Sequence, residues 1–146
     1  MRYISFILCL IPFFFCGCSP KKAPEYNQVI ADGDFVRLPL SEVNDGKVHF
    51  YTYKHADKNV NFLVRTDGKG KLHTHLDACY SCFKYMRGYF VEDTDLVCWA
   101  CRYRYALADE VWEFIQACTP ITLKNSTKRG QLLIKVSRLQ RAGKFF

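Results

Sequence analysis

Two Cys-x-x-Cys pairs in the middle of the chain constrain its fold more than any other feature. Cys79 and Cys82 form the first pair in "DACYSC", Cys98 and Cys101 form the second in "CWAC", and fifteen residues separate them. Two residues between cysteines allow a short turn to direct both sulfur atoms at one point, and a hairpin can bring two such turns together. The spacing therefore favours one shared four-cysteine metal site.

The first twenty residues have the pattern of an export signal. Arg2 precedes an apolar run of 13 residues, 3–15, which is too short to span a bilayer as a stable helix. Gly17 before Cys18 is typical of a lipoprotein cleavage site, so we predict that Cys18 is lipid-modified; an uncleaved membrane anchor is the alternative. The predicted parts are a signal peptide (1–17), a tether (18–34) and a metal-binding domain (35–146).

Both interpretations of the N-terminus place the domain in the cell envelope, held at a membrane. This means the periplasmic side of an inner or outer membrane, or the cell surface. The formal net charge is +7, with basic stretches at Lys21-Lys22 and in 128–144. We interpret these as a solvated basic surface, with binding of anionic headgroups as the alternative. Basic-aromatic motifs of nucleic-acid binding are missing from the sequence, so we expect no nucleic-acid partner.

After lipidation of Cys18, the exported chain has five further cysteines, the fifth being Cys118. An odd number does not suit a framework of disulfides alone. Four thiolates suit iron–sulfur, zinc or copper. Two thiol–disulfide redox pairs, or disulfides between the pairs, remain as alternatives, because exported dithiols are readily oxidised. Cys118 is either a buried core residue or a fifth thiol near the site. His73 and His75 are either solvent-facing residues of a strand or accessory ligands.

Most of the domain has the alternation of apolar and polar residues that is typical of strands. The sequence DGKG at 67–70 predicts a hairpin turn. The segment 108–118, "ADEVWEFIQAC", is the one helix that we expect. We predict an all-β or β-rich α+β domain, an antiparallel meander with one short helix and a cysteine-knuckle metal site. Strands are expected within 35–40, 47–55, 59–66, 71–82, 87–107, 119–123 and 131–139.

Four segments of the chain resemble a known family. These are "LDACYSC", "RGYF", "LVCWACRYRYAL" and "CTPITL", and the resemblance, over residues 45–125, is to the exported domain of the FtrD-like family of membrane iron–sulfur-containing proteins. It implies an iron–sulfur cofactor and a role in metal trafficking beside a permease. The positions that carry it are Cys79, Cys82, Gly88, Tyr89, Cys98, Cys101, Cys118, Pro120 and Ile121.

Motifs of catalysis are missing from the sequence, including a Ser-His-Asp elbow, a phosphate loop and paired carboxylates. We therefore expect a binding protein more than an enzyme. The predicted function is that of a membrane-anchored, exported metal-binding protein in electron transfer or metal handling, with a metal or electron-transfer permease as partner. The alternatives are a thiol–disulfide redox protein that uses the two pairs, and a structural zinc module that binds a partner.

Overall fold

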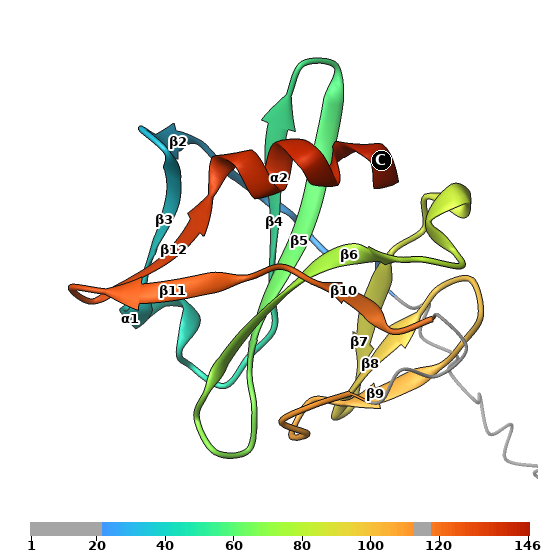
Figure 1. Ribbon diagram of the computed structural model, residues 1–146. Coiled ribbons are helices and arrows are strands. Elements are labelled where there is room, and N and C mark those ends of the chain that lie inside the picture. Colours follow the sequence, from blue (N-terminus) through green and yellow to red (C-terminus); the bar gives the residue numbers. More distant parts are fainter. Residues whose placement is uncertain (1–21, 113–117) are drawn as a thin grey trace, which may run out of the picture.

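A five-stranded sheet forms the centre of the protein in the computed structural model, which describes residues 22–112 and 118–146. Neighbouring strands run antiparallel, except for the two strands at one edge, which comprise residues 27–29 and 49–55 and pair in parallel. The strands are, in spatial order, β1 (Asn27–Val29), β4 (His49–His55), β5 (Lys58–Thr66), β6 (Leu72–Cys79) and β10 (Pro120–Thr122) (Figure 1).

A second, four-stranded sheet and two short helices cover one face of the central sheet. The helix α2 crosses the long strands β4 and β5 (Figure 1). The sheet order is β11 (Asn125–Lys128), β12 (Gln131–Lys135), β3 (Phe35–Pro39) and β2 (Ala31–Asp32), and the helices are α1 (Leu40–Val43) and α2 (Val136–Ala142), the latter followed by the 3-10 turn η2 (Gly143–Phe145).

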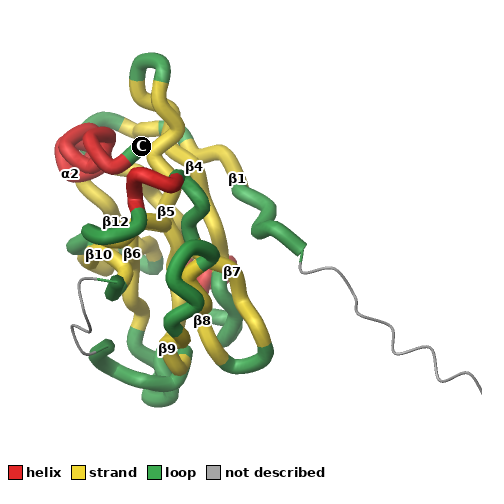
Figure 2. Tube along the Cα trace, turned by 90° about the vertical axis from the view of Figure 1, so that its right-hand side faces the viewer, coloured by secondary structure: helices red, strands yellow, loops and turns green. Residues whose placement is uncertain are grey.

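A three-stranded antiparallel sheet lies against the opposite face of the central sheet (Figure 2). The 3-10 turn η1 (Phe83–Tyr85) leads into it from the end of β6. Its strands are β7 (Tyr89–Glu92), β8 (Asp95–Cys98) and β9 (Arg104–Ala106).

Alternation along the central strands supplies two separate cores. Phe62 and Leu63 are adjacent and both fully buried, yet Phe62 packs toward the four-stranded sheet and α2, and Leu63 packs toward the three-stranded sheet. Ala78 and Cys79 divide in the same way. A strand buried on both faces directs successive side chains into different cores. Cys79 therefore lies in the same core as Cys98.

The β-rich fold and the antiparallel meander are confirmed, and the turn at 67–70 forms as predicted. Asp67 accepts hydrogen bonds from the backbone N–H groups of Lys69 and Lys71, each at 2.9 Å. The expected strand 131–139 is wrong in its second half, where α2 begins at Val136. The buried residues Leu139 and Ala142 have the i, i+3 spacing of a helix face, and this face packs on the first core.

The described residues of the expected helix 108–118 do not form a helix. Residues 108–112 are outside helices and strands, and 113–117 lie outside the described residues. The carbonyl of Asp109 accepts a hydrogen bond from Arg65 Nη1 at 2.7 Å, and Glu110 pairs with Lys69 at 2.9 Å. These contacts hold residues 109 and 110 along the β5–β6 hairpin, where tertiary contacts override the local helical pattern.

Part of the predicted tether, 18–34, belongs to the sheets. β1 pairs with Tyr51, Thr52 and Tyr53 of β4, and β2 pairs with β3. We correct the expected extent of the tether accordingly, because residues 27–32 make ladder hydrogen bonds that a free linker lacks. Residues 22–26 precede β1 outside regular structure, and residues 1–21 lie outside the described residues.

Candidate metal centre

The first cysteine pair begins at the last residue of β6. Cys79 is 1% exposed, and its Sγ accepts a hydrogen bond from the backbone N–H of Cys82 at 3.1 Å. After Cys82 the chain forms η1, and Met86 then takes a left-handed conformation with φ 51°. This turn reverses the chain directly after the pair and leaves Cys82 half-buried, on the solvent side of Cys79.

The second pair begins in the same way, at the last residue of a strand. Cys98 ends β8 and is 2% exposed, whereas Cys101 is half-buried. The N–H of Arg102 donates to the Cys98 carbonyl at 3.0 Å, and Arg102 has φ 64°. Burial raises the pKa of the Cys98 thiol, and hydrogen bonds from the backbone N–H groups of Cys101 and Ala100 oppose this rise. Both pairs therefore form knuckles whose turns donate backbone N–H groups to the buried sulfur atom.

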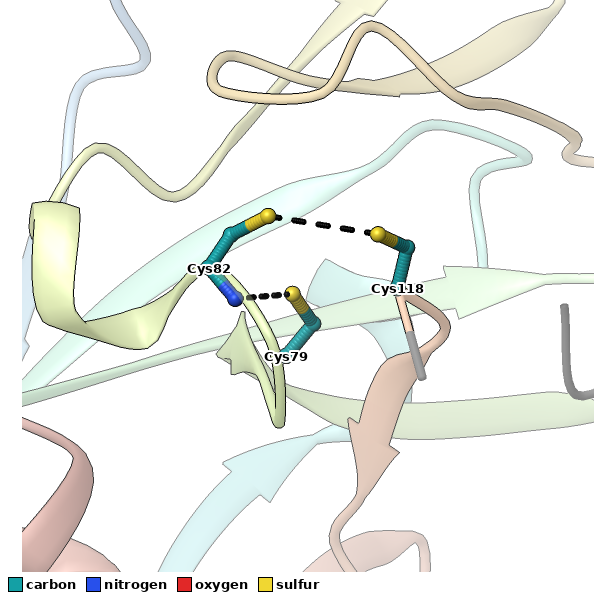
Figure 3. Close-up of side chains that lie close together, drawn as sticks. All are labelled: Cys79, Cys82 and Cys118. Atoms are coloured by element: carbon teal, nitrogen blue, oxygen red, sulfur yellow. Dashed lines mark hydrogen bonds between the residues drawn. The ribbon is translucent and has the colours of Figure 1, made fainter. Parts of the chain in front are cut away.

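The tertiary structure brings all five described cysteines into one cluster, with Cys82 at its centre. One group with sulfur atoms within 4.8 Å of one another is Cys79, Cys82 and Cys118, and a second is Cys82, Cys98 and Cys101. Both groups could hold a metal ion. Figure 3 shows the first group, in which the sulfur atoms of Cys82 and Cys118 are 3.9 Å apart. Within the described residues, these metal-compatible groups consist of cysteines alone.

Cys118 reaches the cluster through the pairing of β10 with β6. Pro120 lies opposite Cys79 in this ladder, so the residue two positions earlier lies beside the first knuckle. The hydroxyl of Tyr89 donates to the Cys118 carbonyl at 2.6 Å and holds this segment. Cys118 is thus both buried and close to the two pairs. Its part in binding metal stays a prediction.

The five described thiols are free, and burial disfavours the charged form of three of them, Cys82, Cys98 and Cys118. Burial raises the pKa of Cys82, and it raises that of Cys118 to about 12. Cys101 differs: burial again raises its pKa, but hydrogen bonds from the Tyr103 N–H and from neighbouring thiols make the net shift downward. Several adjacent thiolates repel one another in a buried site, so a bound cation is the natural partner that replaces their protons.

A buried carboxylate joins the two knuckles. Asp77 is 3% exposed and accepts hydrogen bonds from the Tyr89 N–H at 2.7 Å and from the Tyr26 hydroxyl at 2.5 Å. Burial raises the pKa of Asp77 to about 6, and these two hydrogen bonds oppose the rise. The Gly88 carbonyl in turn accepts a hydrogen bond from the Trp99 N–H at 3.1 Å. Asp77 thereby links β6, the N-terminal segment and the second knuckle.

Glycine is required at position 88, where the chain passes against the Asp77 carboxylate, for two reasons. Its φ is +61°, a conformation that favours glycine, and a Cβ there would lie 2.2 Å from Asp77 Oδ2. The family resemblance marks Gly88 and Tyr89, but our sequence analysis missed Asp77 and Tyr26. The available signal was the i, i+2 spacing of Asp77 and Cys79, which places both on one face of a strand.

The histidines lie away from the sulfur cluster. His73 Nε2 lies 2.8 Å from Asp67 Oδ2, and the ring of His75 stacks on Trp112 with centroids 4.6 Å apart. Burial lowers the pKa of His75 to about 3, and the nearby Arg65 adds to this effect. His75 is thus a neutral packed ring. The interpretation of both histidines as solvent-facing residues is wrong for His75, which is buried. The alternative, accessory ligation, has no support in the cysteine groups described above.

The fold and the site define a β-rich protein with a cluster of cysteines that could hold a metal ion. Residues 43–146 match the family described as "Membrane iron-sulfur containing protein FtrD-like", and the chain belongs to this family. The match spans more than half of the chain, includes all five described cysteines, and confirms the resemblance found in the sequence. None of the curated proteins compared with the chain matches it.

The membrane association in the family description is not explained by a helix of the described residues. Across 22–112 and 118–146, every helix is too short or too polar to cross a bilayer.

Proposed function

We propose that this protein is a membrane-anchored, exported metal-binding protein that acts in electron transfer or metal handling. Cys79, Cys82, Cys98 and Cys101 would hold the metal ion or iron–sulfur cluster, with Cys118 as a fifth thiol. The observation that carries the proposal is the convergence of these sulfur atoms into two groups that share Cys82. The family description adds iron–sulfur as the first candidate for the bound group.

The donor set suits soft metals. Five sulfur atoms without a carboxylate or imidazole in either described group match iron–sulfur, zinc or Cu(I), and do not match calcium or magnesium. When bound, an iron–sulfur group would supply one-electron chemistry. The protein's own residues bury Cys79 and Cys98, donate N–H groups to sulfur, and connect β6 to the start of β7 through Asp77.

The identity of the bound group can be tested on the full chain, purified without oxygen. Elemental analysis and ultraviolet–visible absorption should reveal bound metal, with sulfur-to-iron charge-transfer bands if it is iron. A colourless protein with one zinc would support a structural module instead. Metal-free protein that gains free thiols on reduction would support the thiol–disulfide function and overturn the proposal.

Two single variants test whether the pairs share one site. Cys79→Ser and Cys98→Ser remove one buried ligand from each knuckle, and each should abolish most of the metal content, because a thiolate site loses much of its affinity with one ligand gone. Full metal content in either variant would show that the pairs act independently.

The anchor and the partner are further parts of the proposal. We infer that Cys18 carries the lipid and that the domain acts beside a metal or electron-transfer permease in the same membrane. Mass spectrometry of the mature N-terminus should find an acylated glyceryl group on Cys18. An intact Met1 in the membrane fraction would overturn the lipid anchor.

A further inference from the structure

The two knuckles bury one cysteine each and present the other to solvent. Cys79 and Cys98 are 1% and 2% exposed, whereas Cys82 and Cys101 are half-buried. These last two line an open cavity of about 440 Å³, together with Tyr85, Arg87 and Ala100. A ligand that enters this cavity therefore meets two sulfur atoms of the cluster from their solvent side.

One cation lines this cavity, and two more follow its cysteines in the sequence. Arg87 lines it and also lines the two neighbouring cavities, one of which contains Cys79 and Cys98. Lys84 and Arg102 follow Cys82 and Cys101 closely in the sequence. Their cationic groups lie over aromatic rings, Lys84 5.3 Å from Tyr85 and Arg102 5.1 Å from Phe90. Within the described residues, none of the three cations forms an ion pair with a carboxylate.

The buried carboxylate of Asp77 does not form an ion pair with Arg87 at the mouth of the cavity over Cys82 and Cys101. Asp77 lines a neighbouring cavity with Arg87, but its oxygen atoms accept hydrogen bonds from Tyr89 N–H and the Tyr26 hydroxyl. Cations without carboxylate partners beside a cluster of thiolates have two uses. They offset the charge of the thiolates, and they attract anions that the thiolates alone would repel.

We propose that the opening over Cys82 and Cys101 is the port through which the site exchanges its metal, and that the carrier which enters is a small anionic metal chelate with carboxylate groups. This inference rests on the proposed function. The cavity has the volume of a small-molecule site. A guanidinium group at its mouth matches a carboxylate in charge and in planar geometry.

The transfer is a ligand exchange without a redox change. One metal–carboxylate bond breaks as one metal–sulfur bond forms at Cys82 or Cys101. The thiol proton moves to the released carboxylate or to water, so charge and atoms balance. Cys79 and Cys98 are reached last, because both are buried below the solvent-side thiols.

The test measures metal removal from the full chain in a neutral detergent, loaded with the metal found at purification. Two chelators with the same donor nitrogens are compared: neutral 1,10-phenanthroline and its sulfonated, anionic derivative. Arg87→Glu reverses the charge at the mouth, and Arg87→Lys keeps the charge but not the planar group. Lys128→Glu is the matched control, since Lys128 is exposed on β11 in the four-stranded sheet, away from the cysteine core.

Removal by the anionic chelator at low ionic strength should be about threefold to tenfold slower in Arg87→Glu than in the parent chain. Removal by the neutral chelator should be unchanged, Arg87→Lys should behave like the parent, and Lys128→Glu should change neither rate. The difference should fade near 1 M salt, where the Debye length is only about 3 Å.

Two results would overturn the inference while leaving the proposed function intact. Equal effects of Arg87→Glu on both chelators would mean that Arg87 only offsets the charge of the thiolates. No effect on either would mean that exchange does not pass Arg87. A chain that binds no metal would remove the proposed function, and this inference with it.

Discussion

The two faces of the central sheet use the same strands for different purposes. The face toward the four-stranded sheet and α2 buries mostly apolar and aromatic residues, among them Val60, Phe62 and Leu132, with Thr74 of β6 as a buried polar exception. The opposite face packs Leu63 and Tyr89 around Cys79 and Cys98. Buried polar groups, Asp77 and His75, also lie along β6 at the i, i+2 spacing of Cys79.

This difference shows how a small domain can carry a reactive site without relying on it for stability. The first core contains the sheet-to-sheet and sheet-to-helix contacts that bury most of the large aliphatic residues. Such burial is the main favourable contribution to folding. The second core can therefore hold thiols and a buried carboxylate, which would weaken a domain that had no other core.

The largest expected effect separates the two faces at adjacent residues. Phe62→Ala should destabilise the protein by about 3–5 kcal/mol and Leu63→Ala by about 2–5 kcal/mol, because each leaves a cavity in a full core. Only Leu63→Ala should also weaken metal binding, by about tenfold, since this side chain packs in the core of Cys79 and Cys98. Denaturant unfolding and metal titration would measure the two quantities. Equal losses of metal affinity in both variants would contradict the separation of the faces.

The next effect concerns the crossing between Asp77 and Gly88. Gly88→Ala should cost about 2–5 kcal/mol, from left-handed backbone strain together with overpacking against the carboxylate, and should reduce metal content. Gly130→Ala is the matched control, because Gly130 also has a positive φ, +74°, but nothing within 4 Å of its added Cβ. It should cost only the backbone strain, about 1–2 kcal/mol. Equal unfolding temperatures of the two variants would show that a Cβ at position 88 fits beside Asp77 without overpacking.

A smaller effect on stability is expected for the fifth thiol. Cys118→Ala removes one sulfur atom and should cost about 1 kcal/mol, with the fold unchanged. If Cys118 contributes to the site, the metal content or the absorption spectrum should change. Cys82→Ala is the comparison, because Cys82 belongs to both cysteine groups and its loss should affect metal binding more. Parent-like metal content and spectrum in Cys118→Ala would return this residue to an ordinary core position.

The smallest effect is a pH dependence at the far end of the β5–β6 hairpin. Hydrogen bonds from His73 and from the Lys71 N–H lower the pKa of Asp67 from 3.8 to about 2. The folded state therefore favours the ionised form, and this stabilisation is present above about pH 4 and is lost as the pH falls from 4 to 2. Asp67→Asn should remove this part of the acid dependence. Asp57→Asn, in an exposed turn, is the control; parallel acid-unfolding curves for parent and Asp67→Asn would contradict the prediction.

The fold class and the two cysteine pairs could be predicted from the sequence, because both depend on local patterns. Alternation along β4, β5 and β6 follows from residue order, as does the spacing within each Cys-x-x-Cys turn. The turn at 67–70 is equally local, since Asp67 binds backbone groups two and four residues away.

Tertiary structure alone decided the features that depend on residues far apart in the chain. Cys118 joins the cluster because β10 pairs with β6, and Asp77 meets Tyr26 across 51 residues. Residues 136–142 form a helix, which places Leu139 and Ala142 together in the first core. The strands within residues 27–32 pair with β4 and β3, which come later in the sequence. Local propensity is weak compared with such contacts, so the sequence by itself determined the two cysteine pairs and most of the strands, and packing decided which of them meet.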